Sequence, residues 1–167
     1  MNRFVVMGVA GSGKSRVGAA LARALGVIFV DGDDHHSPAN VARMASGVPL
    51  TDDHRAQWLG TLAEILGAAR DRGTGIVLAC SALRRSHRDV LRAGVAPAPL
   101  QFIYLTGAPA LIAQRLASRA GHFMPATLLE SQLATLEEPG DDEAAWVCDI
   151  RSTPEDIVAS ILTRTRE

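Results

Sequence analysis

Short apolar runs alternate along the chain with longer segments whose apolar residues recur at helical spacing. The first run, at 3–7, is rich in valine, as is typical of a strand buried on both faces of a parallel sheet. Comparable runs predict strands at 27–30, 75–80, 100–105 and 146–150. The segments between and after them predict helices at 14–25, 38–45, 52–73, 84–92, 109–119, 126–136 and 154–163.

Turn and capping residues fit these boundaries. Gly26 is suited to end the first helix, and Ser37 and Pro38 to cap and begin the second. Strands that alternate with helices predict an α/β fold of three layers: five parallel strands with helices on both faces. Residues 1–167 show no internal repeat or linker, so we expect a single domain that binds its ligands at the carboxyl ends of the strands.

The turn between the first strand and the first helix carries the clearest chemical signal. It fits the phosphate-loop (P-loop) pattern G-x-x-x-x-G-K-[ST] in the run Gly8-Val9-Ala10-Gly11-Ser12-Gly13-Lys14-Ser15. Glycines let backbone N–H groups converge on phosphate oxygens, and the following helix directs its positive end at the same anion. We expect the phosphates of a nucleoside triphosphate to bind at Gly8, Gly11, Ser12, Gly13, Lys14 and Ser15. Lys14 is then the catalytic cation at the β- and γ-phosphates, and the Ser15 hydroxyl is a candidate Mg²⁺ ligand.

Acidic residues follow the second predicted strand. Asp31 and Asp33 are expected to face the crevice beside the phosphate loop. One carboxylate is suited to accept the proton of a substrate hydroxyl and the other to hold Mg²⁺, and the residues alone leave open which of Asp31 and Asp33 takes which role. His36 lies close enough in sequence to join the site, whereas an Asp-Gly turn without function is the alternative reading.

Basic residues follow the later strands. The third strand leads to Ser81 and to Arg84 and Arg85, and arginine suits bidentate recognition of a carboxylate or phosphate. Arg115 and Arg119 lie four residues apart on one predicted helix, and Arg119 precedes a glycine-containing loop. Such a loop is what the lid of a phosphotransferase requires to exclude water and to stabilise the transferring group.

Composition narrows the possible partners. The 17 Lys and Arg residues balance 18 Asp and Glu, which gives no sign of a surface for nucleic acid or an anionic membrane. Cys80 and Cys148 lie in apolar runs without CxxC spacing, which indicates neither a disulfide framework nor a zinc site and suits a reducing compartment. No run is long enough to span a bilayer, and no signal core precedes the first strand. We therefore expect a cytoplasmic protein with a small-molecule substrate.

Nearly the whole chain resembles the bacterial gluconate kinases of the P-loop type. Its most diagnostic parts are the runs Met44-Ala45-Ser46-Gly47-Val48-Pro49-Leu50-Thr51-Asp52-Asp53 and Gly121-His122-Phe123. The phosphate loop, Asp31-Gly32-Asp33 with His36, Arg55 with Trp58, Cys80-Ser81-Ala82-Leu83, Arg115 with Arg119, and Leu136-Glu137-Glu138-Pro139 complete the resemblance. Two departures are Arg84-Arg85, where lysines are frequent, and Asp34-His35, which leaves the role of His35 open.

The resemblance implies a P-loop kinase fold with a substrate-binding helical segment at 37–60 and a lid at 119–127. It also implies ATP- and Mg²⁺-dependent phosphorylation of D-gluconate on its 6-hydroxyl, in a cytoplasmic homodimer. Arg115 and Arg119 are then expected at the ATP phosphates, Arg119 in a catalytic role, and the turn at 151–154 is a candidate for holding adenine. Gluconate is a polyhydroxy carboxylate, for which suitable partners are Asp33, His36, Arg55, Ser81, Arg84 and His122.

Other functions fit parts of the same pattern. A shikimate kinase or a nucleoside monophosphate kinase shares the phosphate loop and the arginine lid, and fold alone does not separate them. A nucleotide acceptor calls for base stacking, yet the segment 37–58 holds a single aromatic residue. A nucleotide-dependent switch is the alternative outside the enzymes, although acids and arginines at one crevice favour chemistry on a small acceptor.

Overall fold

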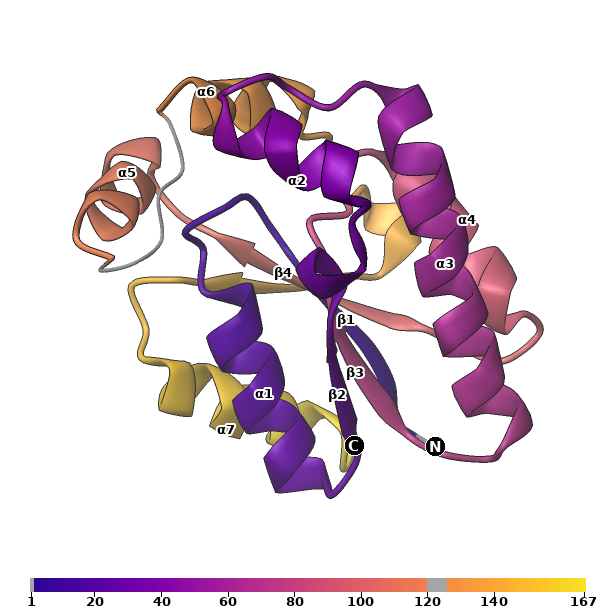
Figure 1. Cartoon of the computed structure of the whole chain (residues 1–167). Helices are drawn as coiled ribbons and strands as arrows, with labels where there is room; N and C mark the ends of the chain where they lie inside the picture. Colours follow the sequence, from indigo (N-terminus) through magenta and orange to yellow (C-terminus); the bar gives the residue numbers. More distant parts are fainter. Residues whose placement is uncertain (1, 120–125) are drawn as a thin grey trace.

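A parallel sheet of five strands forms the centre of the molecule, in a computed structural model that describes residues 2–119 and 126–167 (Figure 1). The strands lie in the order β2-β3-β1-β4-β5, and each pair of neighbours is parallel. Their bounds are β1 (Arg3–Met7), β2 (Ile28–Asp31), β3 (Ile76–Ala79), β4 (Gln101–Thr106) and β5 (Trp146–Asp149). The predicted α/β fold is confirmed.

Helices connect the strands, close to where the sequence predicts them. Two short 3₁₀ turns, η1 (Gly32–His35) and η2 (Asp141–Glu143), supplement them. The helices are α1 (Lys14–Leu25), α2 (Pro38–Ala45), α3 (Asp52–Asp71), α4 (Arg85–Val95), α5 (Pro109–Ala117), α6 (Ala126–Thr135) and α7 (Pro154–Arg164).

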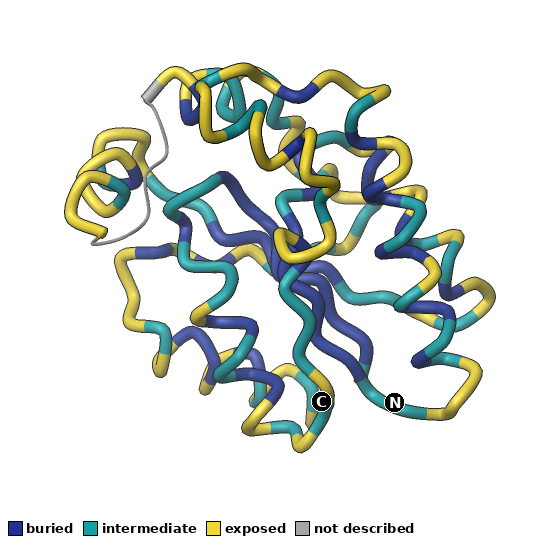
Figure 2. Tube along the Cα trace, viewed as in Figure 1, coloured by how far each residue is buried: buried dark blue, intermediate teal, exposed yellow. Residues whose placement is uncertain are grey.

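The two faces of the sheet are covered by different helices, as Figure 1 shows for α1 and α7 on one side and α3 and α4 on the other. Alternate residues of a strand point to opposite faces. In β1, Phe4 and Val6 therefore pack in the cluster under α1 and α7, while Val5 and Met7 pack under α3 and α4. The strands at the centre are buried along their length (Figure 2), as the valine-rich runs predict.

Several element ends differ from the sequence-based expectation by one to three residues. Helix α4 extends to Val95 instead of 92, because Leu91 and Val95 continue its buried stripe until Pro97 follows. The acidic run after β2 forms the 3₁₀ turn η1, which the Asp31 side chain caps by accepting a hydrogen bond from the Asp33 amide.

The strand order places the predicted site residues beside one another. β3 lies between β2 and β1, so the segments that leave these three strands meet at one edge of the sheet. They are the phosphate loop after β1, Asp31 at the end of β2, and Ser81 after β3. Within the described residues, no helix has the length and apolar character needed to cross a bilayer.

Candidate active site

The phosphate loop runs from Gly8 to Ser15 and leads directly into α1. A side chain at Gly8 would meet Leu105 O at 2.8 Å, and its φ of 152° is rare for other residues. At Gly11, with φ of 80°, a Cβ atom would lie 2.6 Å from Leu116 on α5. Both positions therefore require glycine, because the loop passes close to β4 and α5 there.

Lys14 lies folded over this loop. Its Nζ donates a hydrogen bond to Val9 O at 3.1 Å. Burial lowers the pKa of Lys14, while the carboxylates of Asp33 and Asp31 oppose that shift. The cation is thus held at the phosphate loop and close to the two acids at the end of β2.

Asp31 and Asp33 have different surroundings. Both oxygens of Asp31 are engaged: Oδ2 accepts a hydrogen bond from Ser15 Oγ at 2.6 Å, and Oδ1 accepts one from the Asp33 amide at 3.1 Å. The side chain of Asp33 is 66% exposed, and its ion pair with His36 Nε2 is long, at 3.9 Å. Asp31 is therefore fixed beside Ser15, whereas the carboxylate of Asp33 is accessible.

Trp58 positions His36 at the entrance to α2. The indole stacks on the imidazole with 4.2 Å between ring centroids, and its Nε1 donates to Gly32 O at 2.7 Å. Burial lowers the pKa of His36, which favours the neutral ring at neutral pH. Its Nδ1 is buried without a hydrogen-bond partner in the described chain, as is characteristic of a polar group that a ligand completes.

Arg55, on α3, is a buried cation with little pairing. Its side chain is 9% exposed, and Nη1 lies 3.8 Å from Asp52 Oδ1. Burial lowers the pKa of Arg55. Asp52 also faces Arg84 Nε at 3.6 Å and His87 Nε2 at 3.4 Å, so a single exposed carboxylate is shared among three partners.

The turn after β3 is held in an uncommon conformation. Ala82 has φ of 44°, in the left-handed region, which costs on the order of 1–2 kcal/mol for a residue other than glycine. Ser81 O accepts a hydrogen bond from the Gly8 amide at 3.4 Å, which ties this turn to the phosphate loop. Cys80, directly before this turn, is buried, and desolvation raises the pKa of its thiol to about 12.

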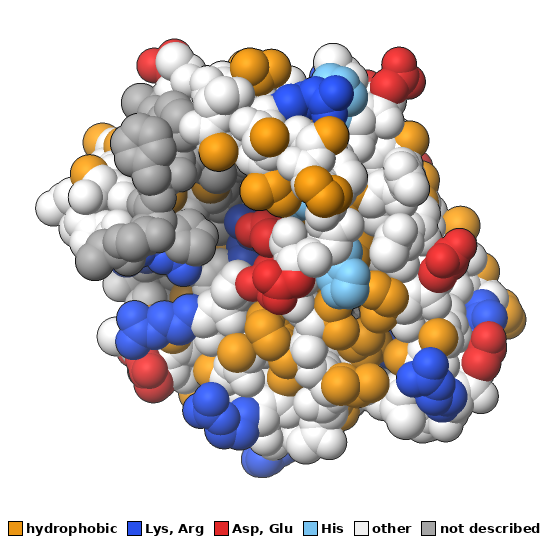
Figure 3. Space-filling view, in the orientation of Figure 1, with side chains coloured by type: hydrophobic (Ala, Val, Ile, Leu, Met, Phe, Trp, Pro, Cys, Tyr) orange, Lys and Arg blue, Asp and Glu red, His pale blue; other side chains and the backbone are white. Residues whose placement is uncertain are grey.

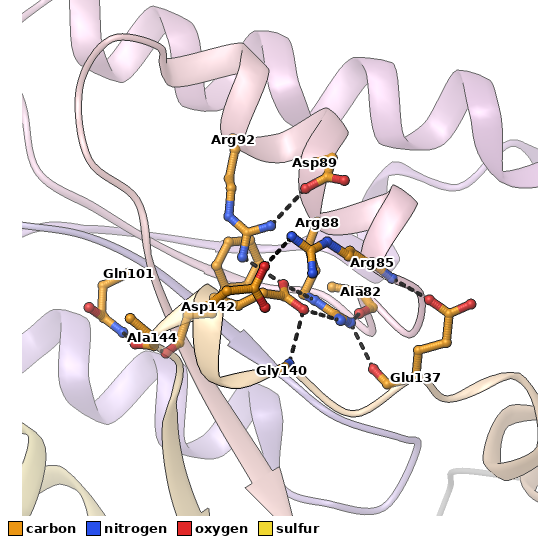
Figure 4. Close-up of polar contacts among 12 residues, drawn as sticks. Ala82, Arg85, Arg88, Asp89, Arg92, Gln101, Glu137, Gly140, Asp142 and Ala144 are labelled. Atoms are coloured by element: carbon orange, nitrogen blue, oxygen red, sulfur yellow. Dashed lines mark hydrogen bonds and ion pairs between the residues drawn. The ribbon is translucent and has the colours of Figure 1, made fainter.

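Arg88, on α4, donates hydrogen bonds that hold the turn after β3 in place (Figure 4). Its Nη1 donates to Ala82 O and Glu137 O, both at 3.0 Å, while Nε and Nη2 each lie 2.7 Å from a carboxylate oxygen of Glu143. Arg92 adds a bond to Glu143, also 2.7 Å long. The buried Arg88–Glu143 pair thus links α4, the turn after β3 and the segment around η2.

The basic residues predicted at the site separate into two groups. Arg119 lines the same cavity as the phosphate loop. Arg115 points elsewhere, because its Nη2 donates to Ile150 O at 2.6 Å. Arg85 is paired with Asp142 at 2.5 Å, and its amide donates to Glu137. The predicted lid spans 119–127, of which residues 120–125, including His122, lie outside the described residues.

A cavity of about 420 Å³ brings the groups together. Figure 3 shows a hollow in this face with acidic and hydrophobic side chains beside it. Of the predicted site residues described, those that line the cavity are Gly11, Gly13, Lys14, Ser15, Asp31, Asp33, His36, Arg55, Ser81 and Arg119. Four that do not are Gly8, Ser12, Arg84 and Arg115. For Gly8 and Ser12 the reason is geometric, since they form the buried base of the loop.

Known proteins match the chain over most of its length. A family described as AAA domain matches residues 4–139. The gluconokinase of Gluconobacter oxydans (strain 621H) is 51% identical over 140 residues, which are 84% of this chain and 78% of that protein. The chain belongs to the gluconokinase family.

Solved structures agree with membership of the gluconokinase family. A gluconokinase from Sinorhizobium meliloti 1021 superposes with a TM-score of 0.85 at 44% identity, covering 95% of this chain and 87% of that one. An unliganded sugar kinase from Janibacter sp. HTCC2649 gives a TM-score of 0.91 at 46% identity, over 98% of this chain and 93% of the other. The resemblance read from the sequence is confirmed.

The structure adds one residue to this gluconokinase site, and two that support it, which the sequence did not indicate as functional. Gln132, on α6, accepts a hydrogen bond from the Ala10 amide at 2.8 Å and lines the cavity. Arg88 and Glu143 stand 55 residues apart and meet only in the folded chain. No motif or strand-end position marks these three residues, so their detection requires the tertiary arrangement.

Proposed function

We propose that the chain transfers the γ-phosphoryl group of ATP to the 6-hydroxyl of D-gluconate, giving 6-phospho-D-gluconate and ADP. The observation that carries the proposal is a cavity that joins the phosphate loop to Asp33 and Arg55. The reaction requires a phosphate site and a site for a polyhydroxy carboxylate side by side, and the proteins of the family to which the chain belongs carry the name gluconokinase.

In this proposal the phosphate loop and Lys14 hold the ATP phosphates, and Ser15 and Asp31 hold Mg²⁺. A hydroxyl and a carboxylate 2.6 Å apart are hard oxygen donors of the kind Mg²⁺ prefers. The described residues contain no cluster of three or more His, Cys, Asp or Glu that suits a metal, as expected for an ion that also uses phosphates and water as ligands. Bound Mg²⁺ would neutralise charge on the transferring group.

Asp33 acts as the general base. Its exposed carboxylate accepts the proton of the 6-hydroxyl while that oxygen forms a bond to the γ-phosphorus, and the bond from phosphorus to the departing ADP oxygen breaks. Arg119, on the cavity wall, stabilises the charge that develops on the phosphoryl oxygens. Asp31 is less suited to the role of base because both its oxygens already accept hydrogen bonds.

Arg55 binds the carboxylate of gluconate. Its guanidinium is buried in the cavity wall with only a long ion pair, so an incoming anion would supply the partner it lacks. His36 and Ser81 contact the substrate hydroxyls. Arg84, whose side chain is 40% exposed at the start of α4, and His122 remain proposed as substrate contacts.

The remaining assignments follow from the family and the fold. Residues 37–60 form the substrate-binding segment of a single domain at 1–167, and 119–127 form the lid.

Arg115 would act on the nucleotide indirectly, through its hydrogen bond to Ile150 beside the proposed adenine turn at 151–154. Two buried free cysteines suit a cytoplasmic location. A homodimer is proposed from the resemblance to the gluconate kinases alone.

An assay that couples ADP production to a signal tests the function, with gluconate, shikimate and AMP as acceptors. We expect turnover with gluconate that requires Mg²⁺. Turnover with shikimate or AMP but not gluconate would overturn the substrate assignment. No turnover with any acceptor would favour the nucleotide-dependent switch instead.

A further inference from the structure

Gln132 reaches from α6 to the apex of the phosphate loop. The Ala10 amide donates to its Oε1 at 2.8 Å, a contact between residues 122 positions apart. The neighbouring Gly11 packs so closely on α5 that a Cβ atom would lie 2.6 Å from Leu116. The apex of the loop is therefore enclosed by α5 and α6.

The bond to Ala10 determines which way the carboxamide of Gln132 faces. Only the oxygen of the amide accepts a hydrogen bond, so Oε1 must be the atom at the Ala10 N–H. The two N–H donors of Nε2 then have no hydrogen-bond partner among residues 2–119 and 126–167. A pair of neutral donors is left beside the loop that holds the phosphates.

The position of Gln132 places these donors in the cavity proposed for phosphoryl transfer. Gln132 lines the same cavity as Lys14, Asp33 and Arg119, the groups proposed to act on the transferring phosphoryl group. Fixed donors aimed at developing negative charge lower the barrier of a reaction, because they require no reorganisation at the moment of transfer. In phosphoryl transfer that charge is spread over the oxygens of the γ-phosphoryl group.

We propose that Gln132 is a catalytic residue that donates hydrogen bonds from Nε2 to the oxygens of the γ-phosphoryl group. The inference rests on the proposed function, since it assigns the residue to phosphoryl transfer from ATP. Gln132 forms no covalent bond with the substrates. The proton of the acceptor hydroxyl is still transferred to Asp33, and ADP is still the leaving group. Its Oε1 stays with Ala10 and fixes the orientation of the donors.

Two substitutions separate the donors of Gln132 from its acceptor. Gln132→Glu keeps an oxygen for the Ala10 amide but replaces the donors with a negative charge, and Gln132→Met removes both. Loss of one donor at a developing oxyanion typically lowers kcat about 10²- to 10³-fold. We expect such a loss in Gln132→Met and a larger one in Gln132→Glu. Ala134→Glu, which adds a carboxylate at an exposed position of the same helix, controls for charge and should change kcat less than about threefold.

Nucleotide affinity separates a catalytic role from a structural one. Both variants should bind ADP like the wild type, because ADP lacks the γ-phosphate, and should bind a non-hydrolysable ATP analogue about 10-fold more weakly. Equal weakening for ADP and the analogue would mean that Gln132 only shapes the loop, which overturns the proposal. Wild-type kcat in Gln132→Met overturns it as well.

The same measurements remain informative if the proposed substrate is wrong. Failure of the wild type to phosphorylate gluconate would contradict the proposed function but leave the comparison of ADP with the ATP analogue intact. In that case, a γ-phosphate-specific loss of affinity in Gln132→Met supports the proposal, and its absence overturns it. Thermal unfolding of each variant confirms that the chain is folded.

Discussion

Arg88 and Arg55 are both buried arginines, but the folded chain provides full pairing for only one of them. Arg88 is 0% exposed and makes two 2.7 Å bonds to Glu143 in addition to bonds to backbone carbonyls. Arg55 is 9% exposed, and within the described chain its ion pairing is limited to Asp52 at 3.8 Å. A buried guanidinium is costly unless its donors are satisfied.

The difference indicates how one residue type can serve either the scaffold or the site. Where the partners belong to the chain, as around Arg88, the arginine holds a turn in place. Where they are few and distant, as around Arg55, the arginine is available to a ligand. The same contrast separates Asp31, whose two oxygens are engaged, from the exposed Asp33.

The largest effect should come from Asp33, whose carboxylate is exposed in the cavity and only weakly paired. Asp33→Asn keeps the shape but removes the base, so we expect kcat to fall about 10²- to 10⁴-fold. ADP affinity should change little. Asp71→Asn, at an exposed position on α3 outside the segment 37–60, is the matched control. Steady-state kinetics with gluconate provide the measurement, and retained turnover in Asp33→Asn would remove Asp33 from the role of base.

The two buried arginines can be compared directly by the same substitution. Arg88→Met leaves Glu143 buried and with one partner fewer, which should lower the free energy of unfolding by about 3–5 kcal/mol. Arg55→Met should change it by less than about 1 kcal/mol, because its ion pair is long. Urea unfolding measures both. Equal destabilisation by the two substitutions would contradict the distinction between scaffold and site.

A double substitution sharpens the result for Arg88. Arg88→Met combined with Glu143→Leu removes the buried charge together with its partner. Most of the lost stability should return, because well-packed apolar side chains often replace a buried ion pair at little cost. A double variant that is no more stable than Arg88→Met would mean that the hydrogen bonds to Ala82 and Glu137 carry the stabilisation.

The stability contributed by Glu143 should depend on pH. Hydrogen bonding to Arg88 lowers the pKa of Glu143 from 4.5 to about 2 in the folded protein. A depressed pKa stabilises the fold above the unfolded value, here by about 3 kcal/mol, and the contribution is lost as the pH falls from 4.5 toward 2. The advantage of the wild type over Glu143→Gln in urea unfolding should therefore narrow over this range. An advantage that is constant with pH would contradict the assignment.

The smallest effect concerns substrate affinity. Arg55→Met should raise KM for gluconate about 10- to 100-fold, because a hydrogen bond to a charged group is worth about 1.5–3 kcal/mol. KM for ATP should stay within about threefold of the wild type. A rise in both constants would argue that Arg55 shapes the whole cavity instead of binding the carboxylate.

Sequence patterns predict the backbone of this protein well and its side-chain directions poorly. The strand ends of Asp31 and Ser81 and the phosphate loop follow from periodicity and from the order of elements. The direction of Arg115 does not, because its distance from Arg119 along the helix says nothing about the carbonyl of Ile150. Gln132 could not be found either, since its contact with Ala10 exists only once α6 has packed against the loop.

Cys80 is a native thiol beside the site, and its rate of chemical modification can report opening of this region. Reagents that attack thiols react with the thiolate, and a buried sulfur with a pKa of about 12 presents almost none at neutral pH. Modification therefore requires an opening of the packing that buries Cys80. The rate of Cys80 modification, measured with and without nucleotide or acceptor, would report how much each ligand suppresses local opening around Cys80.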